Sequence, residues 1–395
     1  MRLRLTALAI AMLAPFTALA DDTAASPAAA APTDAPSAAP IVTTTPPVDA
    51  AAPAATATTA PPAKGWKDLL TVDGLVDSFY QYNFSGANSL SGPTYIRNFD
   101  TTSNTFTLAY AKVGLGLSSE KAGFRLDMGY GLTGALINAA IPPGSMPTGP
   151  TAAAAFIVQQ AYATLTPIDG LTIDFGKFVT TAGAEVIEAN KNWLYSRSIL
   201  FYNIPLLHNG LRVGYKINDM ISVQGSLVNG WNGQGLDPDI NAAKTVGLNA
   251  SITLPMGLTI LPTVYIGKET ALATGDSTRI LVDVVAAYTM DKLGLNFNFD
   301  FVQDQNAGID PFWGLALMGH YSVSDSLNLT ARGEYAQLKS GGTTTALYEG
   351  TVGVALPFSG HYELRPEFRF DGSDQLVFAG KKTQVTATLA ALAYF

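Results

Sequence analysis

Apolar and polar residues alternate along most of the chain. The clearest case lies between residues 361 and 371, where Glu363, Arg365, Glu367 and Arg369 share one face and the residues between them are mostly apolar. A period of two residues predicts a β-strand. Because an arginine at the lipid midplane costs about 2 to 4 kcal/mol, we expect the charged face to point away from lipid, into a wet interior.

The C-terminal segment shows the same alternation. Apolar side chains occupy every second position from Val385 to Phe395, and the chain ends on an aromatic residue. This pattern is typical of the last strand of a bacterial outer-membrane barrel. The alternative at this segment alone is a buried edge strand of a soluble sheet.

Segments of this kind recur along the chain, separated by tight turns that alternate with longer links rich in Gly, Asn and Asp. They lie near 72 to 84, 104 to 117, 123 to 131, 157 to 166, 171 to 179, 209 to 217, 221 to 230, 244 to 254, 258 to 267, 279 to 289, 293 to 303, 312 to 323, 327 to 338, 346 to 356, 361 to 370 and 383 to 395. We therefore predict an all-β fold, a transmembrane antiparallel up-and-down β-barrel of about 16 strands (roughly 14 to 18) with short periplasmic turns and long extracellular loops. A barrel of that size leaves an aqueous channel.

The N-terminal region differs in composition from the rest. Residues 1–20 carry Arg2 and Arg4, then an apolar stretch, then the small-residue site Ala18-Leu19-Ala20, which predicts a secretory signal peptide. Residues 21–64 consist mainly of Ala, Pro, Thr and Ser, which predicts a disordered periplasmic tether. The barrel is expected over residues 65–395.

Composition excludes several kinds of site and partner. The chain has no cysteine, so disulfides and thiolate metal sites are excluded. Loss of Arg2 and Arg4 with the signal peptide takes the formal net charge from −8 to −10, which argues against nucleic acid as a partner.

Catalytic and metal-binding patterns are weak. His320 shares a predicted inward face with Ser322, but a nucleophilic triad also needs an acid, and we expect chance placement. Asp237, Asp239 and Asn241 resemble the start of a calcium loop, yet Ala242 replaces the glycine of its sharp turn. We expect no enzyme activity and no cofactor.

Several short motifs, taken in order, resemble the OmpL-like β-barrel porin family. They are the stretch from Val72 to Phe84, then Arg97-Asn98-Phe99-Asp100, Asn104-Thr105-Phe106, Gly176-Lys177-Phe178, Asn192 to Leu200, and Asn229-Gly230-Trp231-Asn232. The resemblance covers the chain from about residue 69 to its end and leaves out the tether. It implies an outer-membrane pore and implies little about the solute.

Charged residues of the third long link, residues 180 to 208, are candidates for a constriction. In general porins, which this layout resembles in strand count, the third loop folds into the channel. Here it carries Glu185 and Glu188. Candidate pore-lining residues on the strands are Arg125, Lys177, Arg212, Lys216, Arg332, Glu334, Glu363, Arg365, Glu367 and Arg369.

Two interpretations of these charges stay open. Acidic groups on the loop facing a basic wall would create a transverse field that orients solutes and discriminates among ions. Alternatively, the charges pair with neighbours, for example Glu334, Glu363 and Glu367 with Arg332, Arg365 and Arg369, and hold the wall together.

Aromatic residues fall mostly near the ends of the predicted strands. They are Trp66, Tyr80, Tyr82, Tyr130, Trp231, Tyr288, Trp313, Tyr335, Tyr362 and Phe395. Interfacial girdles account for them. The alternative is a track on which sugars stack.

The sequence therefore predicts an outer-membrane porin of a Gram-negative bacterium that passes small hydrophilic solutes and ions by diffusion. The expected partners are outer-membrane lipid, lipopolysaccharide and the solutes, and we expect a homotrimer by analogy with sixteen-stranded porins. The alternatives are a solute-selective channel for anions, sugars or organic acids, a barrel hydrolase, and a non-conducting barrel that acts as an adhesin or envelope tether.

Overall fold

The computed structural model describes residues 65–86, 97–138, 155–232, 241–271, 275–304, 309–340 and 342–395. The predicted signal peptide and tether lie outside the described residues, and so do Asp237 and Asp239 of the calcium-loop resemblance.

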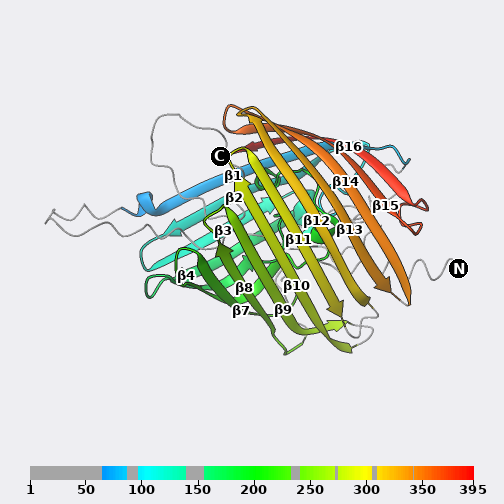
Figure 1. The fold of residues 1–395 in the computed structure, drawn as a ribbon. Coiled ribbons are helices and arrows are strands. Elements are labelled where there is room, and N and C mark those ends of the chain that lie inside the picture. Colours follow the sequence, from blue (N-terminus) through cyan, green and yellow to red (C-terminus); the bar gives the residue numbers. More distant parts are fainter. Residues whose placement is uncertain are drawn as a thin grey trace.

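The described residues form a closed antiparallel barrel of sixteen strands (Figure 1). The strands are β1 Leu70–Asn83, β2 Thr105–Ser118, β3 Ala122–Tyr130, β4 Phe156–Leu165, β5 Leu171–Val179, β6 Leu207–Lys216, β7 Ile221–Val228, β8 Thr245–Thr253, β9 Leu258–Ala271, β10 Gly275–Met290, β11 Leu293–Asp304, β12 Ile309–Ser324, β13 Leu327–Ser340, β14 Thr343–Phe358, β15 Tyr362–Ser373 and β16 Thr383–Tyr394. Each strand pairs with the next, and β1 pairs with β16 to close the barrel. The predicted fold class and strand count are confirmed.

Strand ends differ from the prediction mainly in the second half of the chain. β10 begins at Gly275 where the alternation begins at residue 279, and β14 begins at Thr343 where it begins at residue 346. The strands continue their backbone pairing beyond the hydrocarbon core of the membrane. Outside that core the outward side chains need not be apolar, so the alternation of apolar and polar residues ends before the strand does. For the same reason the links after β9 and β13 shrink to residues 272–274 and 341–342.

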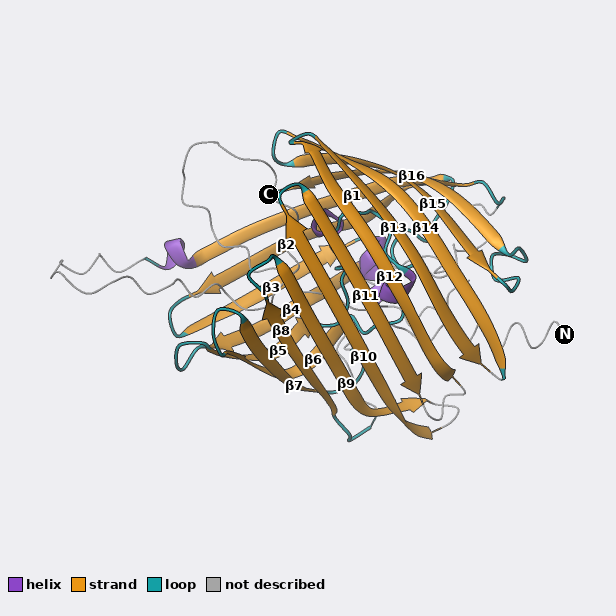
Figure 2. Cartoon of the chain, in the orientation of Figure 1, coloured by secondary structure: helices purple, strands orange, loops and turns teal. Residues whose placement is uncertain are grey.

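The four helices of the described residues are short: η1 Trp66–Leu69, α2 Leu132–Asn138, η2 Ala189–Lys191 and α4 Ile199–Tyr202. None of them is long and apolar enough to span a membrane. Figure 2 shows helices enclosed by the strands of the barrel. Interior space is therefore occupied by chain that is not strand.

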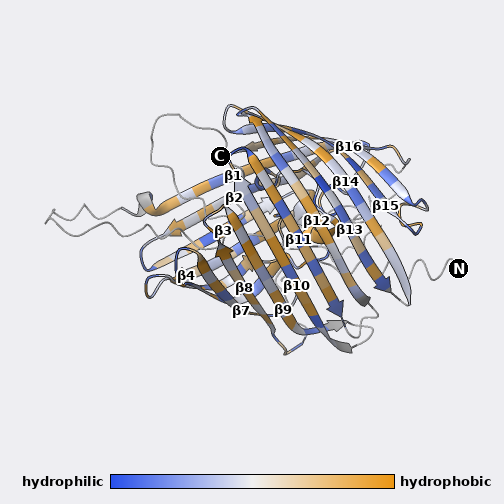
Figure 3. Cartoon of the chain, in the orientation of Figure 1, coloured by the Kyte–Doolittle hydropathy of each residue, from blue (hydrophilic) through white to orange (hydrophobic). Residues whose placement is uncertain are grey.

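The two faces of the wall follow the predicted register. On β15, Leu364, Phe368 and Phe370 are exposed on the outside, whereas Glu363 and Arg369 point inward. Bands of apolar and polar residues alternate along the strands in Figure 3. The charged face points away from lipid, as predicted.

The expectation that this charged face is wet needs correction. Glu363, Arg365, Glu367 and Arg369 are each at most 6% exposed. They are buried because residues 180–206 fold back into the barrel and pack against them. The third long link, and not open lumen, lies against this part of the wall.

One glycine in the wall carries a testable backbone constraint. Gly176 of β5 has φ +137°, and a Cβ there would lie 2.3 Å from the carbonyl oxygen of Ala161 on β4. We expect Gly176→Ala to lower the free energy of unfolding by about 1 to 3 kcal/mol, measured by urea titration in detergent micelles. Gly350→Ala is the matched control, since a Cβ at Gly350 meets nothing within 4 Å. Equal stability of the two variants would contradict the expectation.

Candidate functional site

The link between β5 and β6, residues 180–206, forms an internal loop that we call the third loop. Its helix α4 contacts β11, β12 and β13, and η2 contacts β16. Through these contacts the third loop packs against the strands that enclose it.

Apolar side chains of the third loop fit against glycines of the inner wall. A Cβ at Gly314 would lie 2.8 Å from Leu200, and one at Gly353 would lie 2.5 Å from Leu194. A Cβ at Gly294 would lie 2.7 Å from the ring of Trp193. Wall glycines therefore provide the space that the loop occupies, and burial of Leu194 and Leu200 favours the docked loop.

The third loop satisfies much of its own backbone. Asn192 donates to the carbonyl oxygen of Val186 at 2.7 Å and accepts from its backbone N–H at 2.9 Å. The Nε–H of Arg197 donates a hydrogen bond to the Val186 carbonyl oxygen at 2.9 Å. Ser198 caps α4 by accepting a hydrogen bond from the Phe201 backbone N–H at 2.9 Å. Such pairing is required because buried backbone groups are costly when unpaired.

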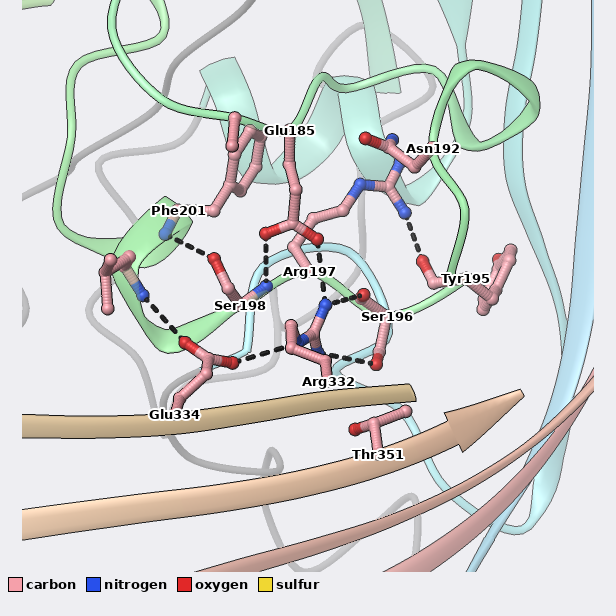
Figure 4. Close-up of polar contacts among 12 residues, drawn as sticks. Glu185, Asn192, Tyr195, Ser196, Arg197, Ser198, Phe201, Arg332, Glu334 and Thr351 are labelled. Carbon is pink, nitrogen blue, oxygen red and sulfur yellow. Dashed lines mark hydrogen bonds and ion pairs between the residues drawn. The ribbon is translucent and has the colours of Figure 1, made fainter. Parts of the chain in front are cut away.

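Arg332 of β13 is the centre of the main charged contact between loop and wall (Figure 4). Its Nη1 lies 2.8 Å from Glu185 Oε1 of the loop, and its Nε lies 3.0 Å from Glu334 and 3.2 Å from Glu349. It also donates to the Ser196 carbonyl oxygen at 2.9 Å. One cation thus binds the loop and neutralises wall carboxylates in a site closed to solvent.

Glu188 makes a second charged contact, with strands on the far side of the β1–β16 seam from β13. Its carboxylate pairs with Lys112 of β2 and accepts a hydrogen bond from Gln159 of β4 at 2.7 Å. Burial by itself raises the pKa of Glu188, but the Lys112 ammonium and these hydrogen bonds hold that pKa below its ordinary value. Glu188 is therefore a carboxylate at neutral pH.

The charged ladder of β13 and β15 binds the main chain of the third loop. Glu334 accepts from the Ile199 backbone N–H at 2.8 Å, and Glu367 accepts from the Tyr195 N–H at 2.8 Å. Arg369 donates to the Arg197 carbonyl oxygen at 2.5 Å. In the same way, Arg365 donates to the Ala189 carbonyl oxygen and also pairs with Glu363. These predicted pore-lining residues are anchors for the loop.

The remaining predicted cations lie on strands away from the carboxylates of the third loop. Arg125 of β3 pairs with Asp73 at 2.6 Å. Arg212 of β6 pairs with Asp174 at 2.7 Å, and Lys216 pairs with the exposed turn residue Asp219 at 2.8 Å. Lys177 of β5 is 8% exposed.

The positions of the charges match the pairing interpretation. Glu185 and Glu188 contact Arg332 and Lys112 directly, so they do not face these cations across an open gap. The periodic pattern of the sequence does not reveal Lys112 as a partner, because β2 differs little in polarity between its two faces.

The first long link also enters the barrel, which the pattern of the sequence did not indicate. Its described part next to β2, residues 97–104, includes Arg97, Phe99 and Asp100, all buried. Asn98 donates to the Phe201 carbonyl oxygen of the third loop at 3.3 Å. The motif Arg97-Asn98-Phe99-Asp100 has no apolar alternation and belongs only to the family resemblance.

The expectation that Trp231 belongs to an interfacial aromatic girdle is wrong. The residue is buried at 3% exposure and its ring lies under the Arg279 guanidinium at 4.9 Å, so it does not belong to a lipid-facing girdle. Tyr130, Tyr362 and Phe395 are exposed near strand ends, as a girdle requires.

His320 has no carboxylate in the place that a nucleophilic triad requires. Its Nδ1 lies 2.9 Å from the Thr330 hydroxyl, its Nε2 lies 3.4 Å from the Ser322 hydroxyl, and its ring stacks on Trp193. Within the described ranges, no group of three or more His, Asp or Glu residues is placed to hold a metal ion.

Solved structures with a similar fold are outer-membrane proteins. Three of them are OmpT of Vibrio cholerae in a trimer form (12% identity, TM-score 0.58, covering 82% of this chain and 99% of that chain), the outer membrane channel DcaP of Acinetobacter baumannii (11%, 0.55, 82% and 97%) and an anion-selective porin from Comamonas acidovorans (12%, 0.58, 82% and 99%). At these identities the likeness shows the fold.

Comparison with curated protein sequences gives no match. The family model described as "Putative beta-barrel porin-2, OmpL-like" matches residues 69–395, which include every strand of the barrel. The chain therefore belongs to this family of OmpL-like β-barrel porins and is a protein of the outer membrane.

Proposed function

We propose that the barrel passes small hydrophilic solutes by passive diffusion, performs no catalysis, and selects solutes mainly by size. The observation that carries this proposal is the third loop docked inside a closed barrel of sixteen strands, as counted over the described residues. A barrel of this size without internal chain leaves a wide aqueous channel, so the loop determines how much of the cross-section stays open.

Selection by size is favoured over selection by charge because the internal charges are largely paired. Glu185 and Glu188 on the loop have Arg332 and Lys112 as partners, and Arg212 on the wall has Asp174. A close pair of opposite charges produces a much weaker field at the pore axis than either charge alone. One similar structure is that of an anion-selective porin, so ion preference has to be measured directly.

Reconstitution tests the proposal against its rivals. We expect stepwise single-channel currents in planar bilayers, weak ion preference in a reversal-potential measurement, and liposome swelling rates that fall smoothly with solute size. Absence of current steps would support a non-conducting adhesin or envelope tether instead. One solute that swells liposomes far faster than others of its size would support a solute-selective channel.

Removing the two acidic groups of the third loop is expected to widen the pore. In Glu185→Ala with Glu188→Ala, Arg332 and Lys112 lose their loop partners, so the loop is held less tightly and the lumen gains net positive charge. We expect higher single-channel conductance and a shift of the reversal potential toward anions. Glu120→Ala is the control, since Glu120 is exposed in the turn between β2 and β3. Unchanged conductance and selectivity would show that these loop carboxylates do not set the pore size or the ion preference.

Assembly and the N-terminal region extend the proposal. We propose a homotrimer surrounded by outer-membrane lipid and lipopolysaccharide, supported by the trimer form of one similar structure. We also propose that residues 1–20 are removed and that residues 21–64 remain as a periplasmic tether. Mass spectrometry of the protein purified from outer membranes tests the cleavage site, and chemical cross-linking in the membrane tests the trimer.

A further inference from the structure

Arg97 of the first long link contacts its own loop and three strands of the barrel wall. Its guanidinium pairs with Asp100 on its own loop and with Asp371 of β15 at 3.0 Å. It also donates to Gln81 of β1 at 3.1 Å and to Thr386 of β16 at 2.6 Å. The side chains of Arg97 and Asp371 are both 0% exposed. Three strands therefore hold this one loop side chain inside the barrel.

Gln81 holds the main chain of the same segment. Its Nε2 donates to the carbonyl oxygens of Asp100 at 3.1 Å and Thr102 at 3.0 Å. Gln81 is completely buried. Residues 97–102 are thus fixed to the inner wall through both side chain and backbone.

The first loop segment also packs directly on the third loop. Phe99 and Phe201 form an edge-on ring pair with centroids 6.0 Å apart, and the Arg197 guanidinium lies 5.4 Å from the centroid of the Phe99 ring. Asn98 donates to the Phe201 carbonyl oxygen. Phe99 is 5% exposed and Phe201 is 2% exposed, so the contact between the loops is closed to solvent.

Asp371 connects the anchors of the two loops. It accepts hydrogen bonds from Arg97 of the first loop and from Arg369, whose guanidinium also donates to the Arg197 carbonyl oxygen of the third loop. Displacement of Arg97 would leave Asp371 with one cationic partner fewer in a buried site. The two loops are therefore coupled through the wall as well as through their own contact.

We propose that Arg97 is a positioning residue that clamps residues 97–102 against the third loop, so that the two loops form one constriction and together set the pore size. The proposal rests on the proposed function, since it assumes that the third loop narrows a conducting channel. It adds a second loop and a specificity-determining residue to that channel. The size limit for solutes then depends on residues 97–102, which precede β2 in the sequence, as well as on the third loop.

Single-channel conductance of the full-length protein tests this role, because only folded and inserted barrels contribute current. Arg97→Ala is expected to raise conductance severalfold and to admit larger solutes in liposome swelling, with partial recovery in Arg97→Lys. Phe99→Ala removes the contact between the loops without removing a charge, and is expected to raise conductance less. Glu120→Ala is the control, because Glu120 is exposed in the turn between β2 and β3, and it is expected to conduct as the parent does.

The outcomes separate this inference from the proposed function. Parental conductance and solute limit in both Arg97→Ala and Phe99→Ala, together with a change in Glu185→Ala with Glu188→Ala, would overturn the clamp and leave the third loop as the constriction. If all of these variants conduct as the parent does, both the clamp and the proposed constriction fail. If Arg97→Ala yields no folded barrel, Phe99→Ala decides the question.

Discussion

Replacing Arg332 by methionine is expected to lower the free energy of unfolding by about 3 to 5 kcal/mol, because removal of one partner leaves buried charges uncompensated. Arg332 lies within 3.2 Å of Glu185, Glu334 and Glu349, and its side chain is 0% exposed. Methionine fills a similar volume but carries no charge, so these carboxylates would repel one another. Urea titration in detergent micelles, followed by tryptophan fluorescence, measures the change.

The same variant is expected to release part of the third loop. Arg332 donates to the Ser196 carbonyl oxygen and side chain, so the loop loses hydrogen bonds as well as its ion pair. Limited proteolysis of folded protein is expected to cut within residues 180–206 faster in Arg332→Met than in the parent. Arg332→Lys keeps the positive charge and is expected to lose less stability. Parental stability and protease resistance in Arg332→Met would show that the site is not an anchor.

Placing an arginine on the lipid face is expected to impair insertion according to its depth. Phe368 lies in the middle of β15, points outward and is 47% exposed. We expect Phe368→Arg to cost about 2 to 4 kcal/mol of folding free energy in lipid vesicles, because a charge at the bilayer midplane loses its hydration. Phe358→Arg is the matched control, since Phe358 is 50% exposed but lies at the last position of β14.

The control variant is expected to cost about 0 to 1 kcal/mol, because side chains near the interface reach water. Folding yield and urea midpoint in vesicles of defined composition measure both variants. Equal penalties at the two positions would mean that Phe368 does not face hydrocarbon, and the predicted register of β15 would then be wrong.

The strands were predictable because each one meets the same local condition. One face contacts lipid and the other does not, so a period of two residues appears within a single segment and needs no knowledge of distant residues. This accounts for β15, where polarity differs strongly between the faces. β10 was predicted too short because its first residues, from Gly275, lie beyond the apolar alternation.

The candidate site was predictable only in part. The inward direction of Arg332, Glu334 and Arg369 follows from the register, whereas their contacts do not. Glu185 and Arg332 are in contact although they are 147 positions apart in the sequence, and Arg97 and Asp371 are in contact although they are 274 positions apart. Periodicity carries no information on such pairs.

The sequence by itself determined that the chain forms a barrel, that the barrel has about 16 strands, and which face meets lipid in those strands whose two faces differ in polarity. Lipid imposes this pattern on every strand separately, at a cost of several kcal/mol for each misplaced charge. Only the tertiary structure decided what fills the interior. The first and third loops return into the barrel and pair with charged side chains that point inward, and the third loop also packs on Gly314 and Gly353. These contacts join distant segments of the chain, so they exist only once the barrel has closed.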